Sequence, residues 1–302
     1  MSVHIKATGK YIPNGVLTNK DFEQIVETSD EWIVTRTGIK KRHKVVEETT
    51  VDMAYYAAMD AINKGSIKKE DIDLIIVATI TGEQKTPSIA NAVQMRLGLE
   101  TAMSFDINAA CTGFIYALEV ASALLSTFAY NRALVIGSET LTKIVDYTDR
   151  NTCILFGDGA GAAIVERSKD ASHFFSQAKP DYNDYLTVKK YIHMDGKRVY
   201  IFAVDAMATS IEKVLEKANL TIDDIDAIIP HQANERIVQA VSKNMNIPYE
   251  RFEMNIAEYG NTSAASIPIT LAEYKEKHPD KKRVLLVGFG GGFTYGAAIV
   301  NV

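Results

Sequence analysis

Three polar residues, Cys111, His231 and Asn261, each follow a short apolar run that is typical of a buried strand. The run before Cys111 covers residues 103–108, and the apolar segment that comes after it covers residues 112–125. That second segment is too long for a strand and predicts a helix, so the thiol should lie at a helix N-terminus. Unpaired N–H groups there favour the thiolate, which should lower the pKa of the cysteine and make it a nucleophile.

The other two residues have the same setting. His231 follows residues 225–230, Asn261 follows residues 252–256, and a helix is predicted after each. Open α/β sheets place their sites at the rim where strands pass into helices, so the three side chains are candidates for one site. Each residue alone has a more ordinary interpretation, as a packing cysteine, a structural histidine and a turn or cap asparagine. The second cysteine, Cys153, lies in an apolar run and is interpreted as core.

Composition limits the classes of protein to consider. The chain has 302 residues, of which 47% are hydrophobic, and a net charge of −5. Its two cysteines cannot form the disulfide framework of a small secreted protein, and neither a leader sequence nor a long apolar span is evident. We therefore expect a soluble, cytoplasmic protein that binds neither nucleic acid nor membrane. No group of His, Cys, Asp or Glu has metal-ligand spacing, so no metal is expected.

Four segments of the first half have counterparts, in the same order, in the second half. The pairs are residues 69–77 with 222–229, 105–108 with 252–255, 132–137 with 283–288, and 161–165 with 296–300. Such self-similarity predicts two copies of one α/β unit packed together. The boundary should fall in the polar stretch 166–190. We divide the chain into an N-terminal half, 1–170, with the nucleophilic cysteine and a C-terminal half, 171–302, with the histidine and asparagine.

Two glycine-rich loops, 157–161 and 290–292, could be mistaken for phosphate-binding loops. A phosphate loop joins a strand to a helix whose N-terminus holds the phosphates. Here the glycines precede residues 162–165 and 297–300, which are rich in β-branched side chains and predict strands. We interpret both loops as tight turns between strands, the second of which brings backbone N–H groups to the reacting centre.

The chain resembles the β-ketoacyl-acyl carrier protein synthase III enzymes of the thiolase superfamily nearly end to end. The resemblance is carried by residues 29–39, 109–113, 156–162, 230–234, 260–266 and 289–293. A Cys-His-Asn set differs from the Cys-His-His of elongating ketosynthases, the Cys-His-Cys of biosynthetic thiolases and the Cys-His-acid set of hydroxymethylglutaryl-CoA synthases. The resemblance implies the α/β thiolase fold, a duplicated five-layer α-β-α-β-α sandwich, in a homodimer.

This resemblance also implies the reaction. An acyl-CoA primer and malonyl-acyl carrier protein would undergo decarboxylative Claisen condensation to β-ketoacyl-acyl carrier protein, which initiates fatty acid synthesis. Cys111 would carry the acyl group, with its own N–H and that of Gly291 as oxyanion donors. His231 and Asn261 would donate hydrogen bonds to the malonyl thioester and stabilise the enolate. No cofactor is implied, because the coenzyme A thioester is a substrate.

Binding residues follow from the same resemblance. Trp32 and Arg150 would sandwich the adenine of coenzyme A. Further contacts to coenzyme A or substrate are expected from Thr28, Arg36, Asn234, Thr86 and Phe289. The acyl carrier protein is expected to dock on Gln232, Ala233, Asn234, Glu235 and Arg236, with Lys243 on the same helix face.

Thr86 distinguishes this chain from relatives that prefer a two-carbon primer. Those relatives often have a bulky aromatic residue before the proline that corresponds to Pro87. The smaller threonine should leave room in the acyl pocket for branched or medium-length chains.

Two alternatives remain open at the level of the sequence. The first is a related ketosynthase III-like acyltransferase of a specialised pathway, which would make a polyketide or quinolone-type product. The second is a catalytically inactive scaffold subunit, against which the intact Cys-His-Asn set argues.

Overall fold

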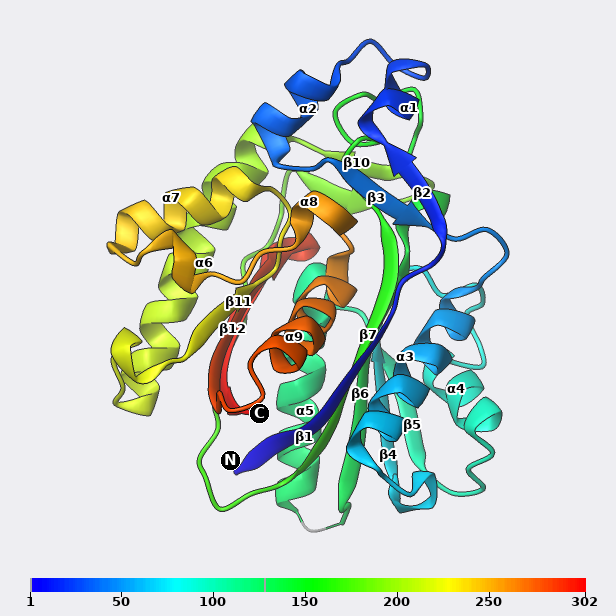
Figure 1. Cartoon of the computed structure of the whole chain (residues 1–302), viewed down its shortest axis with the longest axis vertical. Helices are drawn as coiled ribbons and strands as arrows, with labels where there is room; N and C mark the ends of the chain where they lie inside the picture. The colour runs from blue at the N-terminus through cyan, green and yellow to red at the C-terminus, as the bar shows by residue number, and fades with distance from the viewer. Residues whose placement is uncertain (1, 128) are drawn as a thin grey trace.

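The computed structural model describes residues 2–127 and 129–302 (Figure 1). The strands are β1 (Val3–Tyr11), β2 (Gly15–Thr18), β3 (Lys41–Lys44), β4 (Leu74–Ala78), β5 (Met103–Ile107), β6 (Arg132–Thr140), β7 (Asp158–Arg167), β8 (His173–Ala178), β9 (Leu186–Val188), β10 (Ile192–Met194), β11 (Ala227–Pro230), β12 (Arg283–Gly290) and β13 (Thr294–Asn301).

The α-helices are α1 (Asn19–Glu23), α2 (Asp30–Thr37), α3 (Thr50–Gly65), α4 (Ile89–Leu97), α5 (Gly113–Ser126), α6 (Gly196–Ala218), α7 (Glu235–Met245), α8 (Ile256–Tyr259) and α9 (Ser266–Lys277). Three short 3-10 turns matter for the site: η2 (Ala110–Thr112), η6 (Ser263–Ala265) and η7 (Gly291–Phe293).

Within the described residues, nine strands form one hydrogen-bonded sheet that consists of two parts. The first part has the order β1-β7-β6-β4-β5, and the second has β11-β12-β13 with β8 on the far side of β13. The parts join at one pairing, between His4 of β1 and Asn301 of β13. In each part, parallel strands (β6-β4-β5 and β11-β12) end at the same edge, so their carboxyl ends are the place to look for a site.

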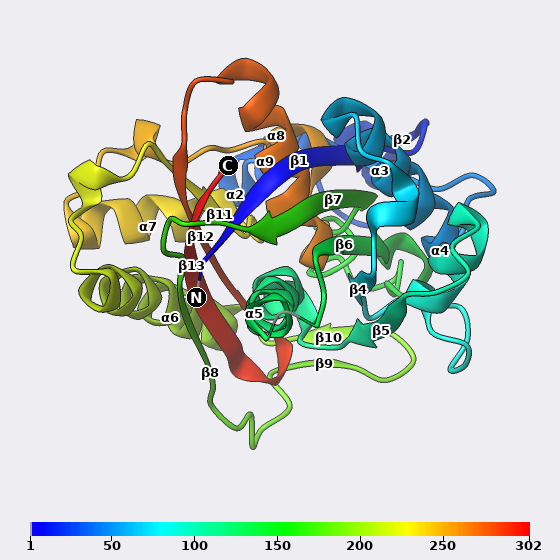
Figure 2. The ribbon, with the colours of Figure 1, turned by 90° about the horizontal axis from the view of Figure 1, so that it is seen from below.

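Five layers follow from the helices that cover these two parts. Helices α3 and α4 cover the outer face of the first part, α6 and α7 cover that of the second, and α5 and α9 lie between them (Figure 2). The structure thus has the predicted α-β-α-β-α arrangement, and the fold class is confirmed. The predicted boundary between the halves, between residues 170 and 171, falls in the connection from β7 to β8, and that division stays a prediction.

The central position of α5 explains its composition. A helix that is hydrophobic on all sides is stable only when all sides are buried. Phe114, Ile115, Leu118 and Leu125 of α5 are fully buried and pack in the cluster that lies between the two parts of the sheet. The outer helix α7 shows the opposite pattern, because only Ile237, Val238 and Val241 of its eleven residues are buried. The sequence therefore positions Cys111 at the start of a helix that is buried between the two parts of the sheet.

One predicted strand is wrong. Residues 252–256, expected to be a strand before Asn261, make a single bridge from Phe252 to Ile228 and then enter α8. The side chain of Gln232 takes the place of a neighbouring strand: its Oε1 accepts hydrogen bonds from the N–H groups of Asn255 (2.7 Å) and Ile256 (2.8 Å). The buried side-chain amide of Gln232 thus accepts the backbone hydrogen bonds that a neighbouring strand would otherwise accept.

The glycine loops differ from each other. The second behaves as predicted, because β12, η7 and β13 form an antiparallel strand-turn-strand unit. The first prediction is wrong in part, because Gly157 follows irregular turns rather than a strand, and Gly159 and Gly161 lie inside β7. Their function is close packing: a Cβ on Gly161 would lie 2.6 Å from the backbone nitrogen of Ile269 in α9.

Over residues 2–127 and 129–302, no helix is both long and apolar enough to span a bilayer. The same residues contain no group of three or more His, Cys, Asp or Glu side chains placed to hold a metal ion.

The contact between β7 and α9 gives a prediction for stability. Gly161→Ala should destabilise the protein by about 1–3 kcal/mol, because the added methyl group must displace the backbone of α9. The matched control is Gly196→Ala, where the nearest atom to the new Cβ is a methionine methyl 3.8 Å away. Urea unfolding of both variants checks the prediction, and equal midpoints would contradict it.

Candidate active site

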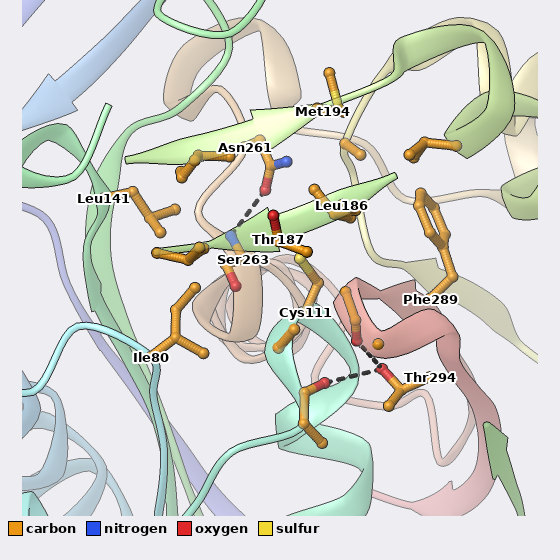
Figure 3. A pocket seen from close by; sticks show the side chains of 18 of the residues that line it. Ile80, Cys111, Leu141, Leu186, Thr187, Met194, Asn261, Ser263, Phe289 and Thr294 are labelled. Carbon is orange, nitrogen blue, oxygen red and sulfur yellow. Dashed lines mark hydrogen bonds between the residues drawn. The ribbon is translucent and has the colours of Figure 1, made fainter. Parts of the chain in front are cut away.

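The predicted trio comes together at the carboxyl ends of the parallel strands. Cys111, His231 and Asn261 line one cavity of about 690 Å³ (Figure 3). Cys111 follows β5, His231 follows β11 directly, and Asn261 lies between α8 and η6. Apolar side chains of Ile80, Leu141, Phe156, Leu186 and Phe289 form much of the remaining wall. The cavity therefore combines a nucleophile, an imidazole and an amide with space for an apolar group.

Cys111 lies in η2, the turn that leads into α5, so the predicted place at a helix N-terminus is confirmed. Ala110, just before it, has a φ of 47°, a left-handed conformation that is uncommon for residues other than glycine. The turn is pressed against the end of β12, where a Cβ on Gly290 would lie 2.6 Å from the Cys111 nitrogen. Glycine is required at 290 because the two backbones touch.

Hydrogen bonds lock η2 to η7. The Thr294 hydroxyl donates to the carbonyl oxygens of Ala109 (3.0 Å) and Gly291 (3.3 Å), and the Thr112 hydroxyl reaches the Thr294 carbonyl (3.2 Å). Figure 3 shows Thr294 below Cys111, with the bonds that the Thr294 hydroxyl donates drawn as dashed lines. Thr294 thus fixes the Gly291 backbone relative to Cys111, as two donors aimed at one oxyanion require. Thr294 was not among the site residues predicted from the sequence, although this residue comes directly after the glycine loop and Phe293.

The prediction of a lowered pKa for Cys111 is wrong. Burial raises the pKa of the thiol from 9.0 to about 12; the Ser263 side chain opposes this shift and the charge of Glu139 adds to it. That change corresponds to roughly 4 kcal/mol, whereas a helix N-terminus contributes at most about 2 kcal/mol. The resting cysteine is therefore a thiol, and a neighbouring group has to take its proton.

His231 is suited to take that proton. The ring is 1% exposed, and burial lowers its pKa to about 3, so the imidazole is neutral. Its Nδ1 lies 2.7 Å from the Ser266 hydroxyl, and its Nε2 is buried without a hydrogen-bond partner among the described residues. Because Nε2 is the nitrogen left free, it is the one available to a thiol or a substrate.

The Ser266 hydroxyl decides what Nε2 does. It also lies 3.0 Å from the carbonyl oxygen of Ser263. When Ser266 donates to that carbonyl, it accepts from an Nδ1–H, and Nε2 is a proton acceptor. When Ser266 donates to Nδ1 instead, Nε2 carries the hydrogen and becomes a donor. The neutral His231 can therefore act in either direction.

Asn261 is held in one orientation. Its Oδ1 accepts a hydrogen bond from the N–H of Ser263 (2.8 Å), which leaves the amide NH₂ directed to the cavity (Figure 3). The backbone of Asn261 pairs with the segment around Phe156, through bonds to Leu155 and Gly157. Asn261 is therefore a rigid donor and carries no charge.

A second cavity, also about 690 Å³, leads from the surface to the first. The two share Met194, Val199, Ala233 and Asn261, so they form one channel. Its outer part is lined by Trp32, Arg36, Asn234 and Arg236. The Arg150 guanidinium lies 4.6 Å from the centre of the Trp32 ring, with Arg36 at the same distance. The cation rests on the ring directly, so Arg150 has to move before a base can stack between them.

The remaining predicted residues divide into two groups. Phe289 and Gly291 line the inner cavity, as expected. Thr28, just before α2, and Thr86, exposed in the loop from β4 to α4, are absent from both cavity walls of this chain. Ile80, which lies in the same connection between β4 and α4, lines the inner cavity instead of Thr86. It was not among the residues predicted from the sequence.

The predicted docking segment 232–236 needs one correction. Gln232 is 1% exposed and its amide is occupied by Thr270 and the backbone of residues 253–256, so it cannot contact a docked protein. Ala233 and Asn234 line the channel, and the Asn234 side chain caps α7 by accepting from the Arg236 N–H. Glu235 accepts a hydrogen bond from Tyr249. Arg236 and Lys243 are exposed on α7.

Comparisons with known proteins agree with this geometry. Models of the 3-oxoacyl-[acyl-carrier-protein] synthase III family match residues 105–180, and those of its C-terminal part match residues 215–302. The chain is 57% identical to beta-ketoacyl-[acyl-carrier-protein] synthase III of Acholeplasma laidlawii, covering 100% of this chain and 99% of the relative. It is 47% identical to the synthase III of Clostridium novyi, with 99% of each chain covered.

Solved structures show the same likeness. The crystal structure of 3-oxoacyl-[acyl-carrier-protein] synthase III from Aquifex aeolicus superimposes with a TM-score of 0.96 at 44% identity. The match covers 99% of this chain and 100% of the Aquifex chain.

The lock between η2 and η7 gives a prediction for the nucleophile. Thr294→Val keeps the shape but loses the hydroxyl bonds to Ala109 and Gly291. We expect acyl transfer from a thioester to Cys111 to slow about tenfold to a hundredfold, because a small misplacement of oxyanion donors is costly. Single-turnover acylation followed by intact-mass spectrometry measures this rate. Thr294→Ser should restore most of it, and equal slowing by both variants would contradict the assignment.

Proposed function

The chain belongs to the β-ketoacyl-[acyl-carrier-protein] synthase III family, and we propose that it initiates fatty acid synthesis by condensing an acyl-CoA primer with malonyl-acyl carrier protein. The observation that carries this proposal is the meeting of a thiol, a free imidazole nitrogen and an uncharged amide donor in one cavity. As an acyltransferase, the enzyme would work in two half-reactions on the same sulfur.

In the first half-reaction, Nε2 of His231 accepts the thiol proton and the Cys111 sulfur attacks the thioester carbonyl. The oxyanion that forms is stabilised by the N–H groups of Cys111 and Gly291, which η2 and η7 bring to the same place. Coenzyme A leaves and takes the proton, so the acyl group remains on sulfur with no net gain or loss of protons.

In the second half-reaction, malonyl-acyl carrier protein enters the same channel. Loss of carbon dioxide leaves an enolate, which the Asn261 amide and an Nε2–H of His231 stabilise at the thioester oxygen. The enolate carbon then attacks the acyl thioester and expels the Cys111 sulfur as a thiolate. A carboxylate in place of Asn261 would repel the enolate, which explains an uncharged donor at this position.

Charges at the channel mouth support a nucleotide-bearing thioester. Arg36, Arg150, Lys197 and Arg236 surround the outer cavity or adjoin its Trp32. Their positive charges suit the phosphates of coenzyme A, and the planar groups suit its adenine. The same cations, together with Lys243, which is exposed on α7 like Arg236, suit an acidic carrier protein, although the whole chain is negatively charged.

We further propose a homodimer that pairs through β5. This strand is an edge of the sheet, bonded to β4 alone within the described residues, and Phe105 and Ile107 on it are only partly buried. Open edges of this kind are normally covered in stable proteins. Met95 on the adjoining α4 is 76% exposed, which adds apolar surface beside the same edge. Cys111 and Cys153 are both free thiols, which agrees with the cytoplasm as the compartment.

A variant of Asn261 tests the two half-reactions. Asn261→Ala should still take an acyl group from acyl-CoA onto Cys111 but lose decarboxylation by about a hundredfold to a thousandfold, the cost of one oxyanion-type donor. Mass spectrometry of the Cys111 peptide follows acylation, and carbon dioxide release follows decarboxylation. Cys111→Ala should abolish the adduct, whereas Cys153→Ala is the matched control and should keep it. An adduct on Cys153, or equal losses in both steps, would contradict the proposal.

Primer selectivity tests the dimer. Thr86 is exposed in the loop after β4, next to the open edge, so it reaches an acyl pocket only across the dimer, in the partner subunit. Thr86→Phe should then shift selectivity toward acetyl-CoA. Ile80→Ala, in the chain's own cavity wall, should favour longer primers by about 0.8 kcal/mol per methylene buried. Competition between acyl-CoAs for Cys111 measures both, and a preference unchanged by Thr86→Phe would remove Thr86 from the pocket.

A further inference from the structure

Glu139 is a fully buried carboxyl group that the two half-reactions leave unused. It lies near the carboxyl end of β6 and is 0% exposed. One oxygen, Oε2, accepts hydrogen bonds from the Thr81 hydroxyl (2.7 Å), the Ile80 N–H (3.1 Å) and the Thr79 hydroxyl (3.2 Å). The other oxygen, Oε1, is buried and has no hydrogen-bond partner among the described residues. A buried oxygen without a partner is costly and calls for an explanation.

On its inner side, Glu139 faces the nucleophile through Ser263. The Ser263 side chain interacts with both the Cys111 thiol and the Glu139 carboxyl, yet its hydroxyl has no well-formed hydrogen bond. Figure 3 shows Ser263 beside Cys111 at the cavity wall. Ser263 Oγ, beside the thiol, and Glu139 Oε1, behind it, are thus both without a hydrogen-bond partner among the described residues. A small movement of the Ser263 hydroxyl completes a path from carboxyl to sulfur.

On its outer side, Glu139 adjoins a cluster of threonine hydroxyls. Thr81 Oγ1, which donates to Glu139, lies 3.4 Å from Thr50 Oγ1, and Thr50 Oγ1 lies 3.0 Å from Thr140 Oγ1. The N–H of Thr50 donates to the carboxylate of Glu83 at 2.5 Å, and Glu83 is exposed. The cluster therefore ends beside a solvated carboxylate, which contacts the backbone of Thr50 and not its hydroxyl.

The chemistry of the proposed reaction requires a proton at this place. Acylation moves the thiol proton to coenzyme A, so it is balanced. Condensation is not balanced in protons. Decarboxylation forms the enolate, and the enolate carbon then bonds to the acyl carbon. The bond from that carbon to sulfur breaks, and Cys111 leaves as a thiolate. One proton must be gained in each cycle. Until it arrives, the thiolate is free to add back to the new ketone.

We propose that Glu139 holds this proton and delivers it to the Cys111 thiolate through the Ser263 hydroxyl, and that solvent returns a proton to Glu139 before the next turnover. The inference rests on the proposed condensation. Ser263 gives its hydrogen to sulfur and takes that of Glu139, which becomes a carboxylate until it is reprotonated. Glu139 touches no substrate and acts through Ser263.

The acidities agree with this direction of transfer. Burial raises the pKa of Glu139 to about 7, while the pKa of Cys111 is about 12, so the proton passes from the stronger acid to the stronger base. His231, across the cavity, has a pKa of about 3 and holds no second proton at neutral pH. Asp158 on the neighbouring β7 is turned toward Thr142 and the Val45 N–H. Glu83 lies at the outer end of the hydroxyl cluster.

The test is Glu139→Gln, which keeps the shape and removes the acid. Acylation of Cys111 by acyl-CoA should stay within about twofold of the parent enzyme, because that step gains no proton. Turnover with malonyl-acyl carrier protein should fall on the order of a hundredfold, as expected for loss of a positioned proton donor. In the parent enzyme, turnover should decline as pH rises through about 7, where Glu139 loses its proton. Glu139→Gln should lack this decline.

Asp158→Asn is the matched control, since it makes the same carboxyl-to-amide change at a buried site on the adjacent strand. It should keep the parent pH profile. Ser263→Ala retains Glu139 but breaks the path, and should reproduce the selective loss of turnover if Glu139→Gln fails to fold. Equal losses of acylation and turnover in Glu139→Gln, or an unchanged pH profile, would overturn the proposal. A parent enzyme that forms no β-ketoacyl product would instead refute the proposed function itself.

Discussion

Each part of the sheet contacts, at a glycine of one of its strands, a short turn that carries active-site residues. The turn η2, with Cys111, presses on β12, where a Cβ on Gly290 would lie 2.6 Å from the Cys111 nitrogen. The turn η6 presses on β6, where a Cβ on Gly137 would lie 2.2 Å from the Ala264 carbonyl oxygen. These two backbone contacts bring residues of distant segments into one cavity. Packing of α5 and α9 between the sheet parts holds both turns in place.

Such close contacts are made with strained backbone. Ala110, Ser263 and Phe293 have φ values of 47°, 48° and 47°, and each begins or ends one of the three turns at the site. A non-glycine residue in this region costs on the order of 1–3 kcal/mol, so its surroundings must hold it. The Phe293 ring stacks on Phe202 of α6 with centroids 4.1 Å apart, and Thr294 bonds to both neighbouring turns. Packing therefore stabilises a geometry that the isolated turns would not adopt.

The sequence was sufficient for the features that depend on local pattern. The apolar segment after Cys111 predicted α5, and the repeated segments together with the family resemblance predicted the five layers. Features that depend on tertiary contacts were missed. A strand was expected at residues 252–256 because its composition is right, but the Gln232 side chain replaces the neighbour that a strand needs. Gln232 was in turn expected at the surface, because sequence alone does not show where an amide points.

The prediction of a lowered pKa for Cys111 was wrong for a related reason. A helix N-terminus is visible in the sequence, whereas the desolvation that outweighs it arises from several segments that only the fold brings around Cys111. Glu139 was overlooked although it stands out in hindsight, as an acidic residue that directly follows the apolar run 133–137 and Ser138. A charged residue near the end of a predicted buried strand therefore indicates a candidate functional group.

The two half-reactions make opposite demands on one imidazole, and the burial of the site makes this possible. A protonated His231 would donate but could not take the thiol proton, so a pKa far below neutrality keeps both functions available. The choice between them then needs no charge to move, because the Ser266 hydroxyl has two acceptors within reach, His231 Nδ1 at 2.7 Å and the Ser263 carbonyl at 3.0 Å. Rotation of that hydroxyl, with loss of the proton at Nδ1 and gain of one at Nε2, exchanges acceptor for donor at Nε2 and leaves the net charge of the ring unchanged. Desolvation thus makes the cysteine a poorer nucleophile at rest, while it keeps the imidazole neutral and so leaves both functions of Nε2 available.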